Sequence, residues 1–192
     1  MSILYSIKTV HHDTQKINKE EDEFHKNIIV IFFIFLSLVA HSSGDLIEDV
    51  CEKSTDYKLC VSSLRADPRS SSADKKGLVR IMLQLSLAKA KDIYNQTLII
   101  LKQPTETILK QCLQICRGTY DLAVSRITSS IKYLDENNFD MVNDGISSAM
   151  AFSVTCEESF TEQPVRKDPL KARSADFFHF NDATVSLLDL FK

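Results

Sequence analysis

The stretch that decides the fold is "LKQCLQICRGTYDLAVSRITSSIKYL", residues 109–134. Apolar side chains recur in it every three or four positions, which is the spacing of one face of an α-helix. No proline interrupts the pattern. The stretch therefore predicts a long amphipathic helix, and its inward face carries Leu109, Cys112, Cys116, Tyr120, Ala123, Ile127, Ile131 and Leu134.

Three further segments have the same periodicity, and short polar turns, "KQPTE" and "DENN", separate the first three of the four helices. Short connections make consecutive helices antiparallel neighbours. Glycine and proline are too few for an all-β fold. We expect an all-α, up-and-down four-helix bundle over about residues 74–191, with the last helix over about residues 174–191. The three further inward faces are Val79, Leu83, Leu87, Ala90, Tyr94, Leu98 and Leu101; Phe139, Val142, Ile146, Ala149, Ser153, Cys156 and Phe160; and Phe177, Phe180, Thr184, Leu187 and Phe191.

Ahead of the bundle, residues 45–70 form a separate piece with two cysteines, Cys51 and Cys60. Each flanking segment is long enough for one or two helical turns, and such short helices are marginal alone in water. A disulfide between the two cysteines would tie them into a helical hairpin. The chain-entropy estimate for so short a loop is about 2.7 kcal/mol.

The N-terminus predicts export. Residues 28–40, "IIVIFFIFLSLVA", form an apolar run of secretory length, too short for a membrane-spanning helix, and small residues follow it. We expect a signal peptide over residues 1–43 and a mature domain over residues 45–192. The segment before the apolar run is unusual for a signal peptide because it carries four lysines and five acids. The alternatives are an uncleaved anchor and a start codon other than that of Met1.

Composition argues against several classes of function. The net charge is −3, and no basic stripe or polybasic segment points to nucleic acid or a membrane surface. The mature domain keeps a single histidine, His179, which has no partner motif for acid–base catalysis. A hydrolase that uses Cys112 as nucleophile would lack a base. We expect no cofactor, no metal site and no enzymatic activity.

The three remaining cysteines lie on the inward faces of the second and third long helices. A bridge between Cys116 and Cys156 would close a loop of about 40 residues, worth about 4 kcal/mol, and would lock neighbouring helices together. Cys112 is then left over. It is either a buried free thiol that packs as a small apolar group, an alternative partner of Cys156, or the site of an intermolecular bridge.

Several motifs together resemble the plant invertase and pectin methylesterase inhibitor family. They are the Cys51 to Cys60 spacing, the segment "SLRADPRSSSADKKGL" after it, "CRGTYDLAV" and "SSAMAFSVTCEESF". The resemblance identifies Cys116 as the family cysteine and Cys112 as the extra one. It therefore implies disulfides Cys51 with Cys60 and Cys116 with Cys156, and a free thiol at Cys112.

The resemblance also implies a function. It indicates a secreted inhibitor that covers the substrate cleft of an enzyme in a one-to-one complex and has no activity of its own. Its partner would be a plant pectin methylesterase in the cell wall or an acid invertase, and a vacuolar location would go with a vacuolar invertase. The alternative hypothesis, outside the class of enzyme inhibitors, is an extracellular helical signalling or interaction module.

The two branches of the family differ at residues that this chain can be compared with. Invertase inhibitors typically carry Pro-Lys-Phe where this chain has Phe139, Asp140 and Met141, so an acid replaces the expected base. Many pectin methylesterase inhibitors carry a free cysteine in the last helix, and this chain has none there. The departures oppose each other, and we favour pectin methylesterase.

Two residues are candidates for contact and modification. In the pectin methylesterase branch, the threonine before the last bridged cysteine meets the enzyme, and Thr155 matches it. The alternative is an ordinary helical threonine whose hydroxyl bonds a backbone carbonyl. Asn95 begins the sequon "NQT" and is a glycosylation acceptor if the chain is secreted.

Overall fold

The computed structural model describes residues 46–192, which are largely helical and contain no strand. The predicted signal peptide, residues 1–43, lies outside the described residues. Within residues 46–192, no helix combines the length and the apolar character needed to cross a membrane. After a first helical stretch over residues 46–51, the elements are α2 (Tyr57–Ala66), η1 (Pro68–Ser72), α3 (Lys75–Leu101), α4 (Thr107–Asp135), α5 (Phe139–Thr161), α6 (Lys171–Ser186) and η2 (Leu187–Phe191).

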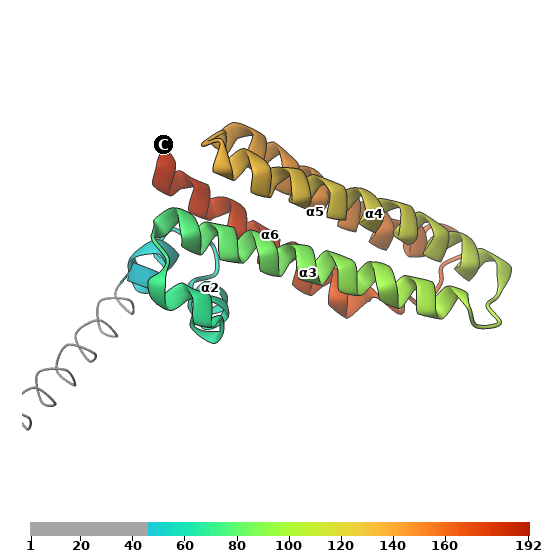
Figure 1. Ribbon diagram of the computed structural model, residues 1–192. Coiled ribbons are helices and arrows are strands. Elements are labelled where there is room, and N and C mark those ends of the chain that lie inside the picture. The colour runs from blue at the N-terminus through green and yellow to red at the C-terminus, as the bar shows by residue number, and fades with distance from the viewer. Residues whose placement is uncertain (1–45) are drawn as a thin grey trace, which may run out of the picture. The chain divides into compact units, whose positions relative to one another are not determined.

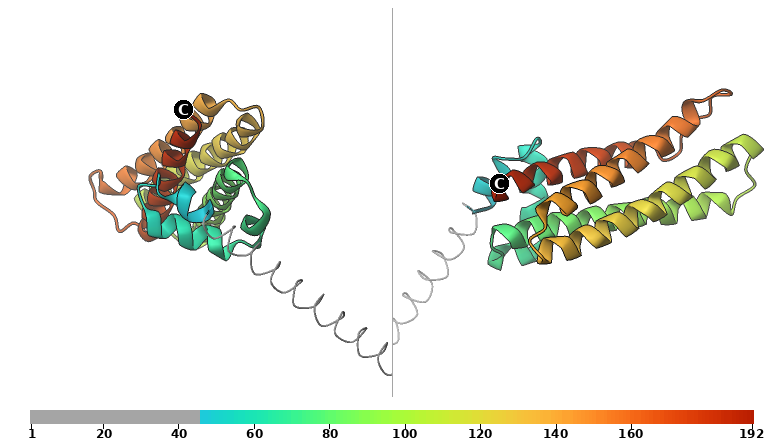
Figure 2. Two further views of the ribbon diagram at one scale, coloured as in Figure 1. Left: turned by 90° about the vertical axis from the view of Figure 1, so that its left-hand side faces the viewer. Right: turned by 90° about the horizontal axis from the view of Figure 1, so that it is seen from above.

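The four long helices, α3 to α6, run up and down beside one another and form an elongated bundle (Figure 1). The end-on view in Figure 2 shows them gathered around a common core. The prediction of an all-α four-helix bundle is confirmed. Among the pairs of elements, α4 and α5 pack against each other most extensively.

Polar residues begin three of the long helices where the sequence turns. Asp74 accepts a hydrogen bond from the N–H of Gly77 (2.7 Å), and Glu106 accepts one from Leu109 (3.1 Å). Asn138 does the same for the amide of Met141. Side-chain oxygens at these positions satisfy amides that have no partner within the helix, and so they fix where α3, α4 and α5 begin.

The N-terminal hairpin lies at the end of the bundle that also carries the C-terminus (Figure 1). It consists of residues 46–51 and α2, and the disulfide from Cys51 to Cys60 joins them. Its turn is fastened to α6, because the Ser54 hydroxyl donates to the carbonyl of Ala183 (3.3 Å). The hairpin is therefore packed on the bundle rather than projecting from it.

The core follows the predicted inward faces of α4 and α5 closely. From Cys112 to Leu134 on α4 and from Val142 to Phe160 on α5, nearly every predicted position is buried. A second disulfide, Cys116 to Cys156, joins these two helices within the core, with 4.5 Å between the Cα atoms. Cys112 is a free, buried thiol that donates to the carbonyl of Ser159 (3.0 Å).

The predicted inward face of α3 is only partly right over its second half. Beyond Ala90, the structure fully buries Ile93 and Thr97, whereas the predicted Tyr94, Leu98 and Leu101 are half-buried, and Tyr94 and Leu101 pack against the edge of the core. The helix turns a polar residue inward because its hydroxyl has a partner: Thr97 donates to the carbonyl of Ile93 (2.8 Å). A count of apolar side chains cannot recognise such a buried threonine.

The last helix also differs from its prediction. It begins at Lys171 rather than near Ser174, and it ends at Ser186, after which residues 187–191 tighten into a 3-10 helix. The Asp168 carboxylate accepts the N–H of Leu170 at 2.7 Å, which supports the earlier turn into the helix. The prolines of the preceding loop concealed this start.

Removing the inter-helix bridge with Cys116→Ala and Cys156→Ala should lower the free energy of unfolding more than removing the hairpin bridge with Cys51→Ala and Cys60→Ala. The chain-entropy estimates are about 4 kcal/mol and about 2.7 kcal/mol, respectively. All four cysteines are fully buried, so the loss of packing is matched. Urea unfolding monitored by circular dichroism measures both. The opposite order would mean that hairpin packing on α6 outweighs closure of the longer loop.

Candidate functional site

The described residues present few of the groups from which a catalytic or metal site is built. Between residues 46 and 192, no three His, Cys, Asp or Glu side chains are placed so that they could hold a metal ion together. His179 is exposed on α6, and its ring meets the Phe178 ring edge-on, with 6.0 Å between the ring centres. The more distinctive features lie on the outer surface of α4 and α5.

Thr155 is exposed on α5, directly before the bridged Cys156. Its hydroxyl donates to the carbonyl of Ala151 at 3.1 Å, which is the common arrangement for a threonine within a helix. The hydroxyl oxygen can still accept a hydrogen bond from outside. Because the disulfide holds the next residue to α4, the backbone at Thr155 is fixed directly beside it.

Two exposed apolar side chains on α4 accompany it. Ile115 is 45% exposed and Leu122 is 51% exposed, and they are seven residues apart, so they lie on the same side of the helix. Ile115 directly precedes the bridged Cys116, as Thr155 precedes Cys156. The bridged Cα atoms are 4.5 Å apart, and each neighbouring Cα atom adds about 3.8 Å. The Cα atoms of Ile115 and Thr155 are therefore within about 12 Å of each other.

These apolar residues were not among the predicted site residues. They sit beside the inward face of α4, at positions where an apolar side chain has no place in the core. Ile115 and Leu122 are both offset from the core face and are seven residues apart, and this repeat is the sequence signal for an exposed apolar surface on α4. It was hidden because the stronger periodicity of the core dominates the same stretch.

The surface between α4 and α5 continues to the other end of the pair as a hollow of about 450 Å³. Arg126, Ser129 and Tyr133 line it from α4, and Met141 and Ser148 are among the residues that line it from α5. Met141 lies fourteen residues before Thr155, close to four helical turns, so both share one face of α5 about 21 Å apart. We call this surface, from Ile115 and Thr155 to Tyr133 and Met141, the α4–α5 groove.

Gly145 lies in the part of the groove near Met141, and it determines how closely α4 and α5 approach there. A Cβ atom at this position would lie 2.1 Å from the Ser130 hydroxyl and 3.3 Å from the carbonyl oxygen of Arg126. The two helices can therefore approach as closely as they do only because residue 145 has no side chain. Ser130 fills the space instead and donates to the carbonyl of Arg126 at 3.0 Å.

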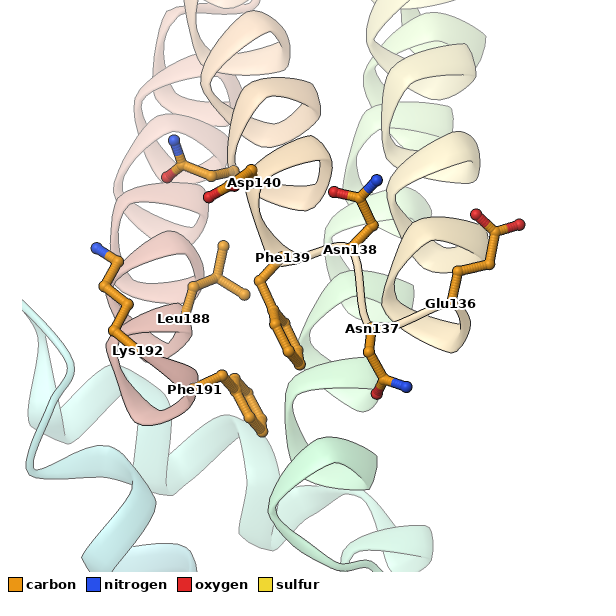
Figure 3. A pocket seen from close by; sticks show the side chains of 9 residues that line it. Glu136, Asn137, Asn138, Phe139, Asp140, Leu188, Phe191 and Lys192 are labelled. Atoms are coloured by element: carbon orange, nitrogen blue, oxygen red, sulfur yellow. The ribbon is translucent and has the colours of Figure 1, made fainter.

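Phe139 and Asp140 lie in a different hollow, at the end of the bundle, with a volume of about 560 Å³ (Figure 3). The Phe139 ring is stacked on that of Phe191, with 4.4 Å between the centres and 3° between the planes. Figure 3 shows the two rings next to one another and Asp140 pointing away from them. Phe139 is thus half-buried and held by the C-terminal residues, whereas Asp140 is exposed.

The predicted contact residues therefore fall into two groups. Thr155 and Met141 share the α4–α5 groove, while Phe139 and Asp140 belong to the end of the bundle. The predicted glycosylation acceptor, Asn95, is exposed on α3, far along the sequence from both groups. The threonine of its sequon, Thr97, is fully buried, so recognition of the sequon would have to precede folding.

The model of the family described as "Plant invertase/pectin methylesterase inhibitor" matches residues 45–187. A cell wall/vacuolar inhibitor of fructosidase from Arabidopsis thaliana is 31% identical, over 69% of this chain and 76% of that protein. A pectinesterase inhibitor from Actinidia deliciosa is 27% identical, over 71% of this chain and 76% of its own length.

Comparison with solved structures agrees on the fold. The crystal structure of a mutant form of a pectin methylesterase inhibitor from Arabidopsis aligns with a TM-score of 0.63. The alignment covers 73% of this chain and 93% of that one, at 15% sequence identity. At this identity, the match supports the helical bundle, and the sequence matches carry the relationship.

Gly145→Ala should destabilise the protein by about 1–3 kcal/mol, the usual cost of inserting a methyl group into a packed contact. Gly118→Ala is the matched control, because Gly118 is on α4 with nothing within 4 Å of its would-be Cβ, and there alanine should stabilise the helix by up to about 1 kcal/mol. Adding Ser130→Ala to Gly145→Ala should recover much of the loss. Thermal unfolding checks all three. Equal effects of the two glycine replacements would contradict a close approach of α4 and α5.

Proposed function

The chain belongs to the plant invertase/pectin methylesterase inhibitor family, and from this premise we propose that it inhibits a plant pectin methylesterase by covering its substrate cleft in a one-to-one complex. Proteins of this family are enzyme inhibitors rather than enzymes, and as a member of the family this chain is an enzyme inhibitor too. The choice of target, the contact surface and the stoichiometry are the proposal.

The observation that carries the proposal is the combination of Thr155 with exposed apolar side chains on a backbone pinned by a disulfide. A residue whose backbone is already held in place loses little conformational entropy on binding, which favours affinity. Ile115 and Leu122 supply apolar area at the same surface, where a partner could exclude water from them. The groove is about 21 Å long between Met141 and Thr155, within the roughly 30 Å span of a standard interface of about 800 Å² per partner.

The end of the bundle supports pectin methylesterase over invertase. In the resemblance to invertase inhibitors, a lysine is expected at the position of Asp140, and a negative carboxylate there would repel an acidic cleft. The neighbouring Phe139 is engaged with Phe191 and offers only part of its ring to a partner. Neither Phe139 nor Asp140 therefore presents the basic group that is expected at this end of the bundle in an invertase inhibitor.

A second candidate target is acid invertase, because the relative that is 31% identical is named an inhibitor of fructosidase, compared with 27% for the pectinesterase inhibitor. We further propose that the chain is exported to the cell wall after cleavage of residues 1–43, with the vacuole as the alternative if invertase is the target. The relative's printed name, which includes both cell wall and vacuole, is consistent with either compartment.

The test of the target is a titration. Purified mature protein is added in increasing amounts to a plant pectin methylesterase and, separately, to an acid invertase, and residual activity is measured. Loss of pectin methylesterase activity that is complete at a one-to-one ratio is the expected result. Inhibition of invertase alone would replace the target by the second candidate, and inhibition of neither would favour a signalling or interaction module.

Thr155→Arg should weaken inhibition of pectin methylesterase by about 30-fold or more, as expected for a central interface residue worth at least 2 kcal/mol. Its melting temperature should stay unchanged because Thr155 is exposed. Thr128→Arg is the matched control. Thr128 is also an exposed helical threonine whose hydroxyl donates to a carbonyl four residues back, but it lies away from the groove, about 120° around α4 from Leu122. Equal loss of inhibition in both variants would remove Thr155 from the contact.

Asp140→Lys separates the two targets. It restores a basic group where the invertase branch carries one, so it should leave inhibition of pectin methylesterase within about twofold and create or strengthen inhibition of acid invertase. Inhibition constants for both enzymes are the measurement. A strong loss of pectin methylesterase inhibition in this variant would place the end of the bundle, rather than the groove, at the enzyme.

A further inference from the structure

The connection between α5 and α6, residues 162–170, contains a carboxylate in an unusual position. One oxygen of Asp168, Oδ1, accepts the N–H of Leu170 at 2.7 Å. The other, Oδ2, is buried and has no hydrogen-bond partner among the described residues. A buried, ionised carboxylate oxygen without a donor is costly, because nothing replaces the water that it has lost.

The groups that face Asp168 do not neutralise it. Glu157 of α5 adds negative charge, and Lys171 at the start of α6 offsets only part of it. From α4, the Tyr120 hydroxyl donates to Ser174 Oγ at 3.0 Å rather than to the carboxylate. Burial, together with the charges of Asp168 and Glu157, raises the pKa of Tyr120 to about 12, so this side of the contact stays uncharged.

The nearby arginine is committed elsewhere. Arg166 donates to both carboxylate oxygens of Glu106, at 2.8 and 3.2 Å, and this pairing lowers the pKa of Glu106 to about 2. Lys167 lies on the exposed rim of the same connection. Burial, with a smaller contribution from Glu157, consequently raises the pKa of Asp168 above its usual range.

We propose that Asp168 makes the α5–α6 connection pH-sensitive: protonated, the side chain stays buried and holds the start of α6, and ionised, it moves to water and opens the connection. Asp168 already lines a hollow of about 1030 Å³ together with Phe160, Val165 and Pro169, so its side chain has only a short way to move to reach water. Opening would also uncover Leu170, which is fully buried in the closed form. The inference goes beyond inhibition, since it concerns the pH range in which the start of α6 is held closed.

The direction of the pH dependence follows from linkage. An unfolded aspartate has a pKa of about 3.9, and the folded one is higher, so the folded chain binds the proton more tightly. The stabilising contribution is complete below about pH 4 and is lost as the pH rises through the folded pKa of Asp168. The connection is therefore closed in an acidic compartment and opens more readily at neutral pH.

Hydrogen exchange of the first turn of α6 tests the proposal in the mature protein. Protection of the Leu170 and Ser174 amides, which donate to Asp168 Oδ1 and to the Leu170 carbonyl, should fall between pH 4 and pH 7.5 once corrected for intrinsic exchange rates, by at most about tenfold per pH unit. Asp168→Asn should abolish this fall, because the amide keeps an acceptor for the Leu170 N–H and carries no charge. Its protection at pH 7.5 should match that of the wild type at pH 4.

Two further variants make the result specific. Asp121→Asn, at an exposed carboxylate on α4, should keep the wild-type fall, and Glu157→Gln should shift the fall to lower pH by removing a neighbouring negative charge. If Asp168→Asn does not fold, Asp168→Ser retains an acceptor and serves the same comparison. A wild type whose protection is independent of pH, or an Asp168 variant that keeps the fall, would overturn the proposal.

Discussion

The disulfide between Cys116 and Cys156 is the constraint on which the rest of the structure depends. It joins the two helices that pack most extensively, and it fixes their separation at one end of the pair. Towards the other end, the absence of a side chain at Gly145 lets the two helices approach closely beside Ser130. Between these two points, the outer surfaces of α4 and α5 form one groove, and the residues before each bridged cysteine, Ile115 and Thr155, are brought to its edge.

The sequence predicted the helices well because burial in a bundle follows one periodicity. The inward faces of α4 and α5 are apolar almost without interruption, so counting apolar residues located them correctly. The same count missed the positions of α3 at which hydroxyl groups are buried. Ser86 donates to the Asn181 side chain of α6 and Thr97 donates to a carbonyl of its own helix, so each is buried without the penalty of a missing partner. The partner of Ser86 is 95 residues away in the sequence, so no local pattern contains it.

The candidate site was predictable only in part, for a related reason. Thr155 could be named because a motif around Cys156 resembles a known family. Ile115 and Leu122 had to be seen on the folded surface, since an apolar residue next to a core face is exposed or buried according to the position of the neighbouring helix. Asp168 is a still clearer case. Asp168 lies near Tyr120, which is 48 positions earlier in the sequence, and Tyr120 donates to Ser174, which is 54 positions later than Tyr120. No local sequence pattern contains these neighbours.

The bridged Cys156 also lies between two regions of α5 for which different functions are proposed. On one side of Cys156 lies Thr155, whose helix is held to α4 by a covalent bond. On the other side lie Glu157 and Phe160, which face the connection that carries Asp168. The proposed change of charge at Asp168 would occur next to this last turn, and Cys156, bonded to Cys116, lies between that turn and Thr155. A disulfide placed there lets the connection respond to pH while the surface proposed to meet the enzyme keeps its geometry.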